Sequence, residues 1–184
     1  MKNFLFLFLI PIMFLNCASI SEEKTIKMEV IKMKVKSSAF KEGENIPIKY
    51  TCDGKDISPE ISWEDVPDSV ESLALICDDP DAPMKTFVHW VIYNIPPRVN
   101  KLEEGTRPIW GLPIGAIQGI NDFGNTGYGG PCPPRGPAHH YHFKLYGLNT
   151  KLDAERGISK KELLKKMEGH IIAKGELVGI YKRK

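Results

Sequence analysis

The stretch HHYHFKLYG, residues 139–147, decides the fold. Successive side chains of a β-strand point to opposite faces, so His139 and Tyr141 share a face with the apolar Phe143 and Leu145, whereas the positions between them carry His or Lys. This alternation predicts a half-buried strand. It turns His139 and Tyr141 toward the protein interior and the intervening histidines toward water.

Further strand candidates lie on both sides of this stretch. Each is a short run rich in apolar residues and bounded by Pro or Gly turns. These runs are 46–51, 73–77, 87–95 and 176–181. Strands that follow one another without helices between them favour two packed antiparallel sheets over alternating strands and helices. The sequence therefore predicts a mostly β fold.

An apolar alternation near the N-terminus changes register. It runs from Ile26 to Val30, slips by one residue, and resumes from Ile31 through Met33 to Val35. A slip by one residue turns every following side chain to the other face, so without a bulge only one half shares the core register. We expect the half that begins at Ile31 to do so.

His89 lies inside the apolar run 87–95. Strict alternation puts it on the face of Phe87, Val91 and Tyr93. One buried histidine in an apolar strand is more often a core residue than a ligand contact, so His89 taken alone predicts no site.

Two segments between the strands are rich in polar or turn-forming residues. Asp78, Asp79 and Asp81 follow a buried strand and repel one another, and this pattern fits a solvated loop as well as it fits a site. The stretch 105–136 contains nine Gly and five Pro in 32 residues and predicts a long ordered loop. Because long loops in compact domains often carry function, this loop is the first place to look for a site.

One helix is predicted before the last strand. Ser159 and Glu162 have capping-box spacing, apolar residues follow at 163–167, and Gly169 is a stop signal.

Composition excludes several classes of protein. The 184 residues carry 25 Lys+Arg against 23 Asp+Glu, are 42% hydrophobic and contain 4 Cys. Disordered chains have fewer apolar residues, and disulfide scaffolds have many more cysteines. A net charge of +2 without a basic cluster speaks against a nucleic-acid partner. An ordinary folded domain remains.

The N-terminus has the pattern of an export signal. Lys2 precedes a run from Phe4 to Leu15 that is apolar except for Pro11 and is too short to cross a bilayer. The residues FLNC at 14–17 resemble the lipobox of bacterial lipoproteins. We therefore expect a signal peptide over 1–16, a lipidated Cys17 with a polar tether over 17–30, and a domain over 31–184. The expected location is the cell envelope, held to a bacterial membrane through the lipid.

An ordinary signal peptide is the alternative. Cleavage near Ala18 or Ser19 would release a soluble periplasmic or secreted protein.

Five segments together resemble a known family. They are YTCDG (50–54), DPDAP (79–83), HWVIYN (89–94), GPCPP (130–134) and HHY (139–141). In this order they resemble the phosphatidylethanolamine-binding protein family and, more narrowly, its bacterial Raf-kinase-inhibitor-like branch. The resemblance runs from about Met33 to Tyr181.

The resemblance implies a fold and a site. The fold is a Greek-key antiparallel β-sandwich with a few short helices, one of them near the C-terminus. The site is one small pocket for a phosphate-like anion or a phospholipid head group. The implied ligand-binding residues are Asp79, Pro83, His89, Pro134, His139 and Tyr141.

Charge dictates how such a pocket works. An ionised Asp79 repels an anion, so we expect it to accept a histidine N–H, to fix that histidine's tautomer and to favour its protonation. The histidines then meet the anion, and Tyr141 donates one more hydrogen bond. Anion binding should weaken as the pH rises past the histidine pKa, which is about 6.5 in model peptides.

Three other functions compete with anion binding. A hydrolase would need a nucleophile, and Ser58, Ser62 and Ser72 lie outside any elbow motif, so we predict no catalytic residue and no cofactor. A metal site would have ligands in His89, His139 and Asp79 but lacks tight spacing, and none is predicted.

Inhibition of a protein partner is the third function. Eukaryotic relatives bind kinases and one branch inhibits a carboxypeptidase, but an exported domain does not meet a cytoplasmic kinase. An envelope protease or a host protein is the alternative partner.

The cysteines leave one question open. With Cys17 lipidated, Cys77 is most simply a buried thiol. Export would allow a bridge between Cys52 and Cys132, but the sequence does not give their separation in space.

Overall fold

The computed structural model describes residues 30–184. The predicted signal peptide, the lipidation of Cys17 and the tether up to residue 29 lie outside these described residues. The strands in chain order are β1 (Ile31–Lys32), β2 (Lys34–Lys36), β3 (Ile61–Glu64), β4 (Ser72–Asp79), β5 (Phe87–Ile95), β6 (Lys101–Leu102), β7 (Ile117–Gln118), β8 (His139–Leu148) and β9 (Ile171–Tyr181). The helices are the 3-10 turn η1 (Ile48–Tyr50) and α1 (Lys160–Met167).

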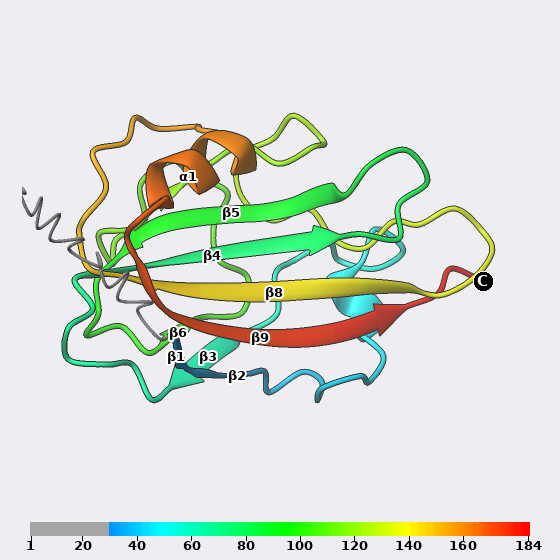
Figure 1. Cartoon of the computed structure of the whole chain (residues 1–184). Helices are drawn as coiled ribbons and strands as arrows, with labels where there is room; N and C mark the ends of the chain where they lie inside the picture. Colours follow the sequence, from blue (N-terminus) through cyan, green and yellow to red (C-terminus); the bar gives the residue numbers. More distant parts are fainter. Residues whose placement is uncertain (1–29) are drawn as a thin grey trace, which may run out of the picture.

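The strands form two sheets. The larger has the order β1-β9-β8-β4-β5-β7, and the smaller has the order β2-β3-β6 (Figure 1). All neighbours are antiparallel except β1, which pairs parallel with β9 at the edge of the large sheet. The predicted mostly β sandwich with a helix near the C-terminus is confirmed, and the parallel edge strand is an addition to it.

Apolar side chains are buried on both faces of the large sheet. One cluster lies between the sheets and includes Trp63 of β3 and Phe143 of β8. The other lies under α1 and includes Ile76 of β4 and Leu163 of the helix. Strands buried on both faces read as continuous apolar runs, which explains why β4 lacks alternation. Figure 1 shows α1 covering the β5 side of this sheet.

Most strand predictions are confirmed, but the strand at 46–51 is wrong. The chain forms η1 there, after Pro47. Pro47 has no N–H to give to a ladder, and the apolar side chain of Ile48 is 61% exposed. The chain pairs with the edge of β9 up to Ile46, whose N–H donates to the Ile180 carbonyl, and the pairing is not continued beyond Pro47.

The N-terminal register prediction is confirmed for two of its three residues. Met33 and Val35 are buried between the sheets, whereas Ile31 is 47% exposed. The chain leaves the large sheet after β1 and joins the small sheet as β2, so Ile31 lies on an outer edge.

The face predicted for His89 is right for one predicted neighbour and wrong for two. Phe87 packs against His89, with 5.2 Å between the ring centroids. Val91 and Tyr93 pack in the cluster under α1, whereas the His89 ring centroid lies 5.1 Å from that of Tyr141 on the opposite face. In the β4–β5 pairing, Cys77 faces Trp90 and Asp78 faces Val88, so His89 is the extra residue of a bulge that breaks the alternation.

The helix prediction is confirmed at both ends. Ser159 accepts the Glu162 backbone N–H, and the Glu162 side chain accepts the Ser159 N–H, which completes the capping box. Gly169 follows the helix with a φ of 78°, a conformation that glycine adopts without strain.

The segment 105–136, predicted as a long ordered loop, contains only the two-residue strand β7 and isolated bridges.

Candidate functional site

A cavity of about 170 Å³ opens where β4 ends and where β5 and β8 begin. All six residues named from the sequence line it, and five further residues complete its wall. The full lining is Asp79, Ala82, Pro83, Phe87, His89, Phe123, Cys132, Pro133, Pro134, His139 and Tyr141. Larger hollows beside α1 and on the outer face of β8 and β9 are lined mainly by surface side chains. The structure thus brings together the six candidates, and ligand binding by them stays a prediction.

A buried carboxylate and imidazole form one wall of the cavity. Asp79 Oδ2 lies 2.7 Å from His139 Nδ1, and both side chains are only 4% exposed. Asp79 Oδ1 accepts the Asp81 backbone N–H at 2.8 Å and so shapes the turn after β4. Since the carboxylate faces Nδ1, the proton of His139 is held there and Nε2 is the nitrogen left for other partners.

The hydrogen bond that orients the His89 ring is made to the backbone. Its Nδ1 lies 2.7 Å from the carbonyl oxygen of Gly129, which accepts and never donates, so Nδ1 carries the proton. Burial lowers the pKa of the His89 imidazole below its ordinary value, and the nearby backbone carbonyls and Asp79 oppose this effect only in part. The rings of Phe87 and Phe123 pack against the His89 ring, with centroid distances of 5.2 and 5.5 Å. We therefore expect His89 to be neutral near pH 7 in the empty cavity.

The Tyr141 hydroxyl has no hydrogen-bond partner among the described residues, although it is buried. Burial, and then the charge of Asp79, raise the pKa of Tyr141, so the phenol keeps its proton. A buried polar group without a partner is unfavourable, and such groups in folded proteins usually meet water or a ligand. Tyr141 is thus a donor held ready beside the cavity.

The charge of the site comes from histidine. The described residues that line the cavity include no Lys or Arg. Because Nδ1 of both His89 and His139 is already committed as a donor, each Nε2 accepts hydrogen bonds when the ring is neutral and donates only when it is protonated. The cavity gains positive charge only by taking up a proton.

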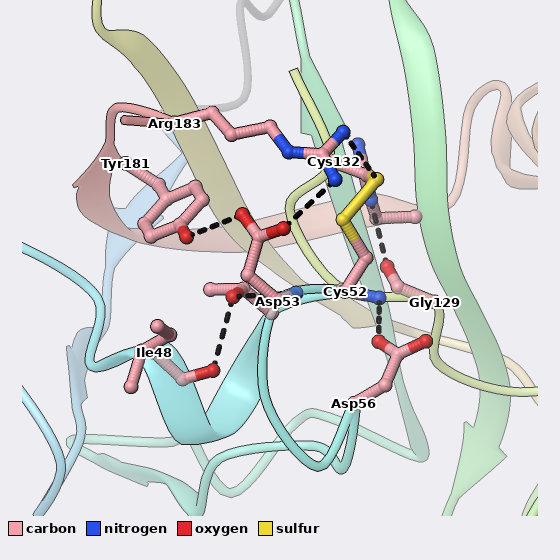
Figure 2. Close-up of a disulfide and its surroundings, with 11 residues drawn as sticks. Ile48, Cys52, Asp53, Asp56, Gly129, Cys132, Tyr181 and Arg183 are labelled. Carbon is pink, nitrogen blue, oxygen red and sulfur yellow. Dashed lines mark hydrogen bonds and ion pairs between the residues drawn. A yellow bond between two sulfur atoms is a disulfide. The ribbon is translucent and has the colours of Figure 1, made fainter. Parts of the chain in front are cut away.

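The Cys52–Cys132 bridge that the sequence left open is present. It joins two loops across 80 residues of sequence, and Cys132 lines the cavity (Figure 2). Cys77 is a buried free thiol, as predicted.

Sequence reasoning missed five lining residues. Pro133 and Cys132 lie inside a quoted segment but were not assigned to the pocket, and Ala82 lies inside another. Phe87 lies two residues before His89 on the same face, which was a usable signal. Phe123 lies in the Gly-rich loop with 44% of its surface exposed, and the residues next to it in the sequence gave no sign that it lines the cavity.

Residues 30–184 contain no group of three or more His, Cys, Asp or Glu side chains arranged to hold a metal ion. The three candidate metal ligands considered from the sequence therefore do not form such a group; they are His89, His139 and Asp79.

Fold and site together define a class of protein: a two-sheet β-sandwich with a small cavity lined by histidine, tyrosine and aspartate at one end of its central strands. The sequence model described as "Phosphatidylethanolamine-binding protein" matches residues 36–182. The chain belongs to the phosphatidylethanolamine-binding protein family.

Relatives and solved structures agree with this assignment. A UPF0098 protein of Methanothermobacter thermautotrophicus is 53% identical over 151 residues, which are 82% of this chain and 99% of that protein. A UPF0098 protein of Pyrococcus horikoshii is 53% identical over 174 residues, which are 92% of this chain and 83% of that protein.

Two solved structures share the fold. The phosphatidylethanolamine-binding protein homologue CT736 from Chlamydia trachomatis superposes with a TM-score of 0.76 at 42% identity, covering 83% of this chain and 99% of that one. YbcL of E. coli has the same TM-score and coverage at 35% identity.

Proposed function

We propose that this protein binds a small phosphate-like anion, free or as a phosphorylated head group, in the histidine-lined cavity. The observation that carries the proposal is the buried hydroxyl of Tyr141, which has no hydrogen-bond partner within residues 30–184 and lines the same cavity as the Asp79–His139 pair. A phosphate oxygen accepts from such a hydroxyl and from a protonated imidazole at once.

His139 is the histidine best placed to carry the positive charge. Its Nδ1 faces the Asp79 carboxylate, which compensates an imidazolium, whereas Nδ1 of His89 faces only a neutral carbonyl. The His139 Nε2–H then donates to the anion. His89 remains an acceptor for an O–H of a protonated phosphate, or it becomes a donor after a second proton is taken up.

The proposal is for binding and not for catalysis. Cys132 is the one lining residue, among those described, with a thiol-type nucleophile, and its sulfur is held in the disulfide. The small cavity volume suits an inorganic anion or a head group better than a whole lipid.

Isothermal calorimetry with inorganic phosphate and with O-phosphoethanolamine at pH 6 tests the proposal. We expect Tyr141→Phe to weaken binding of both probes about tenfold, the effect of one lost charge-assisted hydrogen bond. His142→Gln is the matched control, because this histidine faces outward and pairs with Glu176. If neither probe binds the wild type, or if Tyr141→Phe and His142→Gln bind equally well, the proposal is wrong.

We further propose export and attachment to the membrane through Cys17, supported by the FLNC motif and the apolar run before it. In residues 30–184 no helix is long and apolar enough to span a bilayer. Mass spectrometry of the N-terminal peptide from the native host tests this proposal. A diacylglyceryl group on Cys17 is the expected result, and an N-terminus at residue 19 or 20 without lipid would contradict it.

A further inference from the structure

One wall of the cavity is held to the fold by very few hydrogen bonds. This wall segment, residues 132–138, contains Cys132, Pro133 and Pro134 of the lining. Three of its residues are prolines without an N–H, and among the described residues its backbone makes no hydrogen bond to the rest of the fold. Its attachments are the strand β8 that begins at His139 and, at the other end, the disulfide of Cys132.

The residues just before the wall segment are held differently. The Gly129 N–H donates to His89 O, and the Gly129 carbonyl accepts from His89 Nδ1. The Gly130 N–H donates to Asp56 Oδ1 at 2.7 Å, and the Pro131 carbonyl accepts from the Cys52 N–H. These bonds do not depend on the disulfide. Figure 2 shows the bonds at Gly129 and Asp56 next to the disulfide of Cys132.

The other half of the disulfide lies in a turn that is itself fixed. Next to Cys52, Asp53 accepts from the Tyr181 hydroxyl at 2.8 Å and forms an ion pair with Arg183 at 2.8 Å (Figure 2). The disulfide therefore ties the wall segment to a rigid base. Pro133 is buried, whereas residues 134–137 are exposed, so the exposed part of the wall segment depends most on this tie.

We propose that the Cys52–Cys132 disulfide is a redox latch on the cavity: the oxidised form holds the proline wall in place for the anion, and reduction by a dithiol releases the wall and weakens binding. This inference rests on the proposed anion-binding function. It adds a way to regulate that site.

The exchange reaction is favoured by the surroundings. The bridge is half-buried, and Arg183 Nη1 lies 3.8 Å from Cys132 Sγ. A dithiol thiolate attacks Cys52 Sγ, the protein S–S bond breaks, and its electron pair leaves on Cys132 as a thiolate beside the guanidinium. The second thiol of the reductant then closes its own disulfide and releases Cys52. Two electrons pass from the dithiol to the protein, and the protons of the dithiol pass to the released sulfurs or to solvent.

Calorimetry with inorganic phosphate on the oxidised, the reduced and the reoxidised protein tests the latch. The Cys77→Ala background is used throughout, so that all thiol chemistry belongs to the pair. We expect about tenfold weaker binding after reduction and recovery after reoxidation. By linkage, saturating phosphate must oppose reduction by the same factor. Equal affinity within twofold in the oxidised and reduced forms would overturn the latch.

Backbone 15N order parameters test the latch without a ligand. Reduction should lower them at Arg135, Gly136 and Ala138 and leave Gly129 and Gly130 unchanged. If the oxidised protein binds no phosphate, the proposed function fails, and the order parameters alone decide: unchanged values in the wall segment overturn the latch, and a selective decrease supports it. Arg183→Gln is a second variant, and it should slow reduction by a dithiol because the Cys132 thiolate loses its cation.

Discussion

Asp78 and Asp79 are neighbours at the end of β4, and both carboxylates are buried, yet they serve different regions of the molecule. Asp78 points toward α1 and is fully paired with two cations, Lys144 at 2.8 Å and Lys160. Asp79 points to the other face and pairs with one imidazole next to an open cavity. The first region holds a carboxylate paired with two lysines, whereas the second has a cavity with room for a ligand beside its carboxylate–imidazole pair.

The comparison teaches that burial of an acid does not by itself mark a site. Both aspartates are buried to the same degree. The difference lies in the partners, two lysine ammonium groups for Asp78 and one imidazole for Asp79, and in the cavity beside Asp79.

Asp78→Asn should produce the largest effect on stability. The variant leaves Lys144 and Lys160 without their carboxylate inside a partly closed region, and we expect the free energy of unfolding to fall by about 3 kcal/mol. Urea denaturation measures this loss. Phosphate affinity at pH 6 should stay within twofold of the wild type, and a large loss of affinity would show that the two regions are not separate.

Asp79→Asn should mainly reduce phosphate affinity, whereas Asp78→Asn should mainly reduce stability. Without the carboxylate an imidazolium at His139 is no longer compensated, so phosphate affinity should fall about tenfold at pH 6, equivalent to about 1.4 kcal/mol. The pH at which binding is lost should also move downward. Calorimetry across pH 5 to 8 measures both changes, and an unchanged pH profile would remove Asp79 from the proton chemistry of the site.

The smallest expected effect is the change in stability that protonation of His89 causes in the protein without a bound anion. Its pKa is lowered in the folded state, so the unfolded state binds the extra proton more readily as the pH falls below the unfolded value of about 6.5. Stability from this group is therefore present above pH 6.5 and is lost at lower pH. Chemical denaturation at pH 7.5 and 5.5, for the wild type and His89→Gln, measures it. The variant should lose less stability on acidification, and equal losses would contradict the assignment.

Much of the fold could be predicted because local sequence patterns determine where many of its strands and its helix form. The alternation in 139–147 gave the inward and outward faces of β8, and Ser159 with Glu162 gave the start of α1. The strand at 46–51 was wrong because the chain pairs with the edge of β9 only up to Ile46, whose N–H donates to the Ile180 carbonyl, and Pro47 follows with no N–H to continue the pairing. The short strands β3 and β6 were missed because two to four residues carry too little pattern.

The full set of six candidate site residues came from the family resemblance, and periodicity added only the inward direction of His139 and Tyr141. Alternation correctly placed His89 with Phe87 but wrongly placed it with Val91 and Tyr93, since a bulge is a property of two paired strands and leaves little trace in one. The disulfide stayed open because 80 residues of sequence separate its cysteines. Phe123 reaches the cavity through the fold of a long loop, which no local signal reveals.

The most direct test of the central claim is the phosphate affinity of the wild-type protein at pH 5.5 and pH 8, measured by calorimetry in two buffers of different ionisation enthalpy. A cavity whose positive charge comes only from imidazole should bind phosphate at least tenfold more tightly at pH 5.5 and should take up a proton on binding. Equal affinity at the two pH values with no proton uptake would contradict the account.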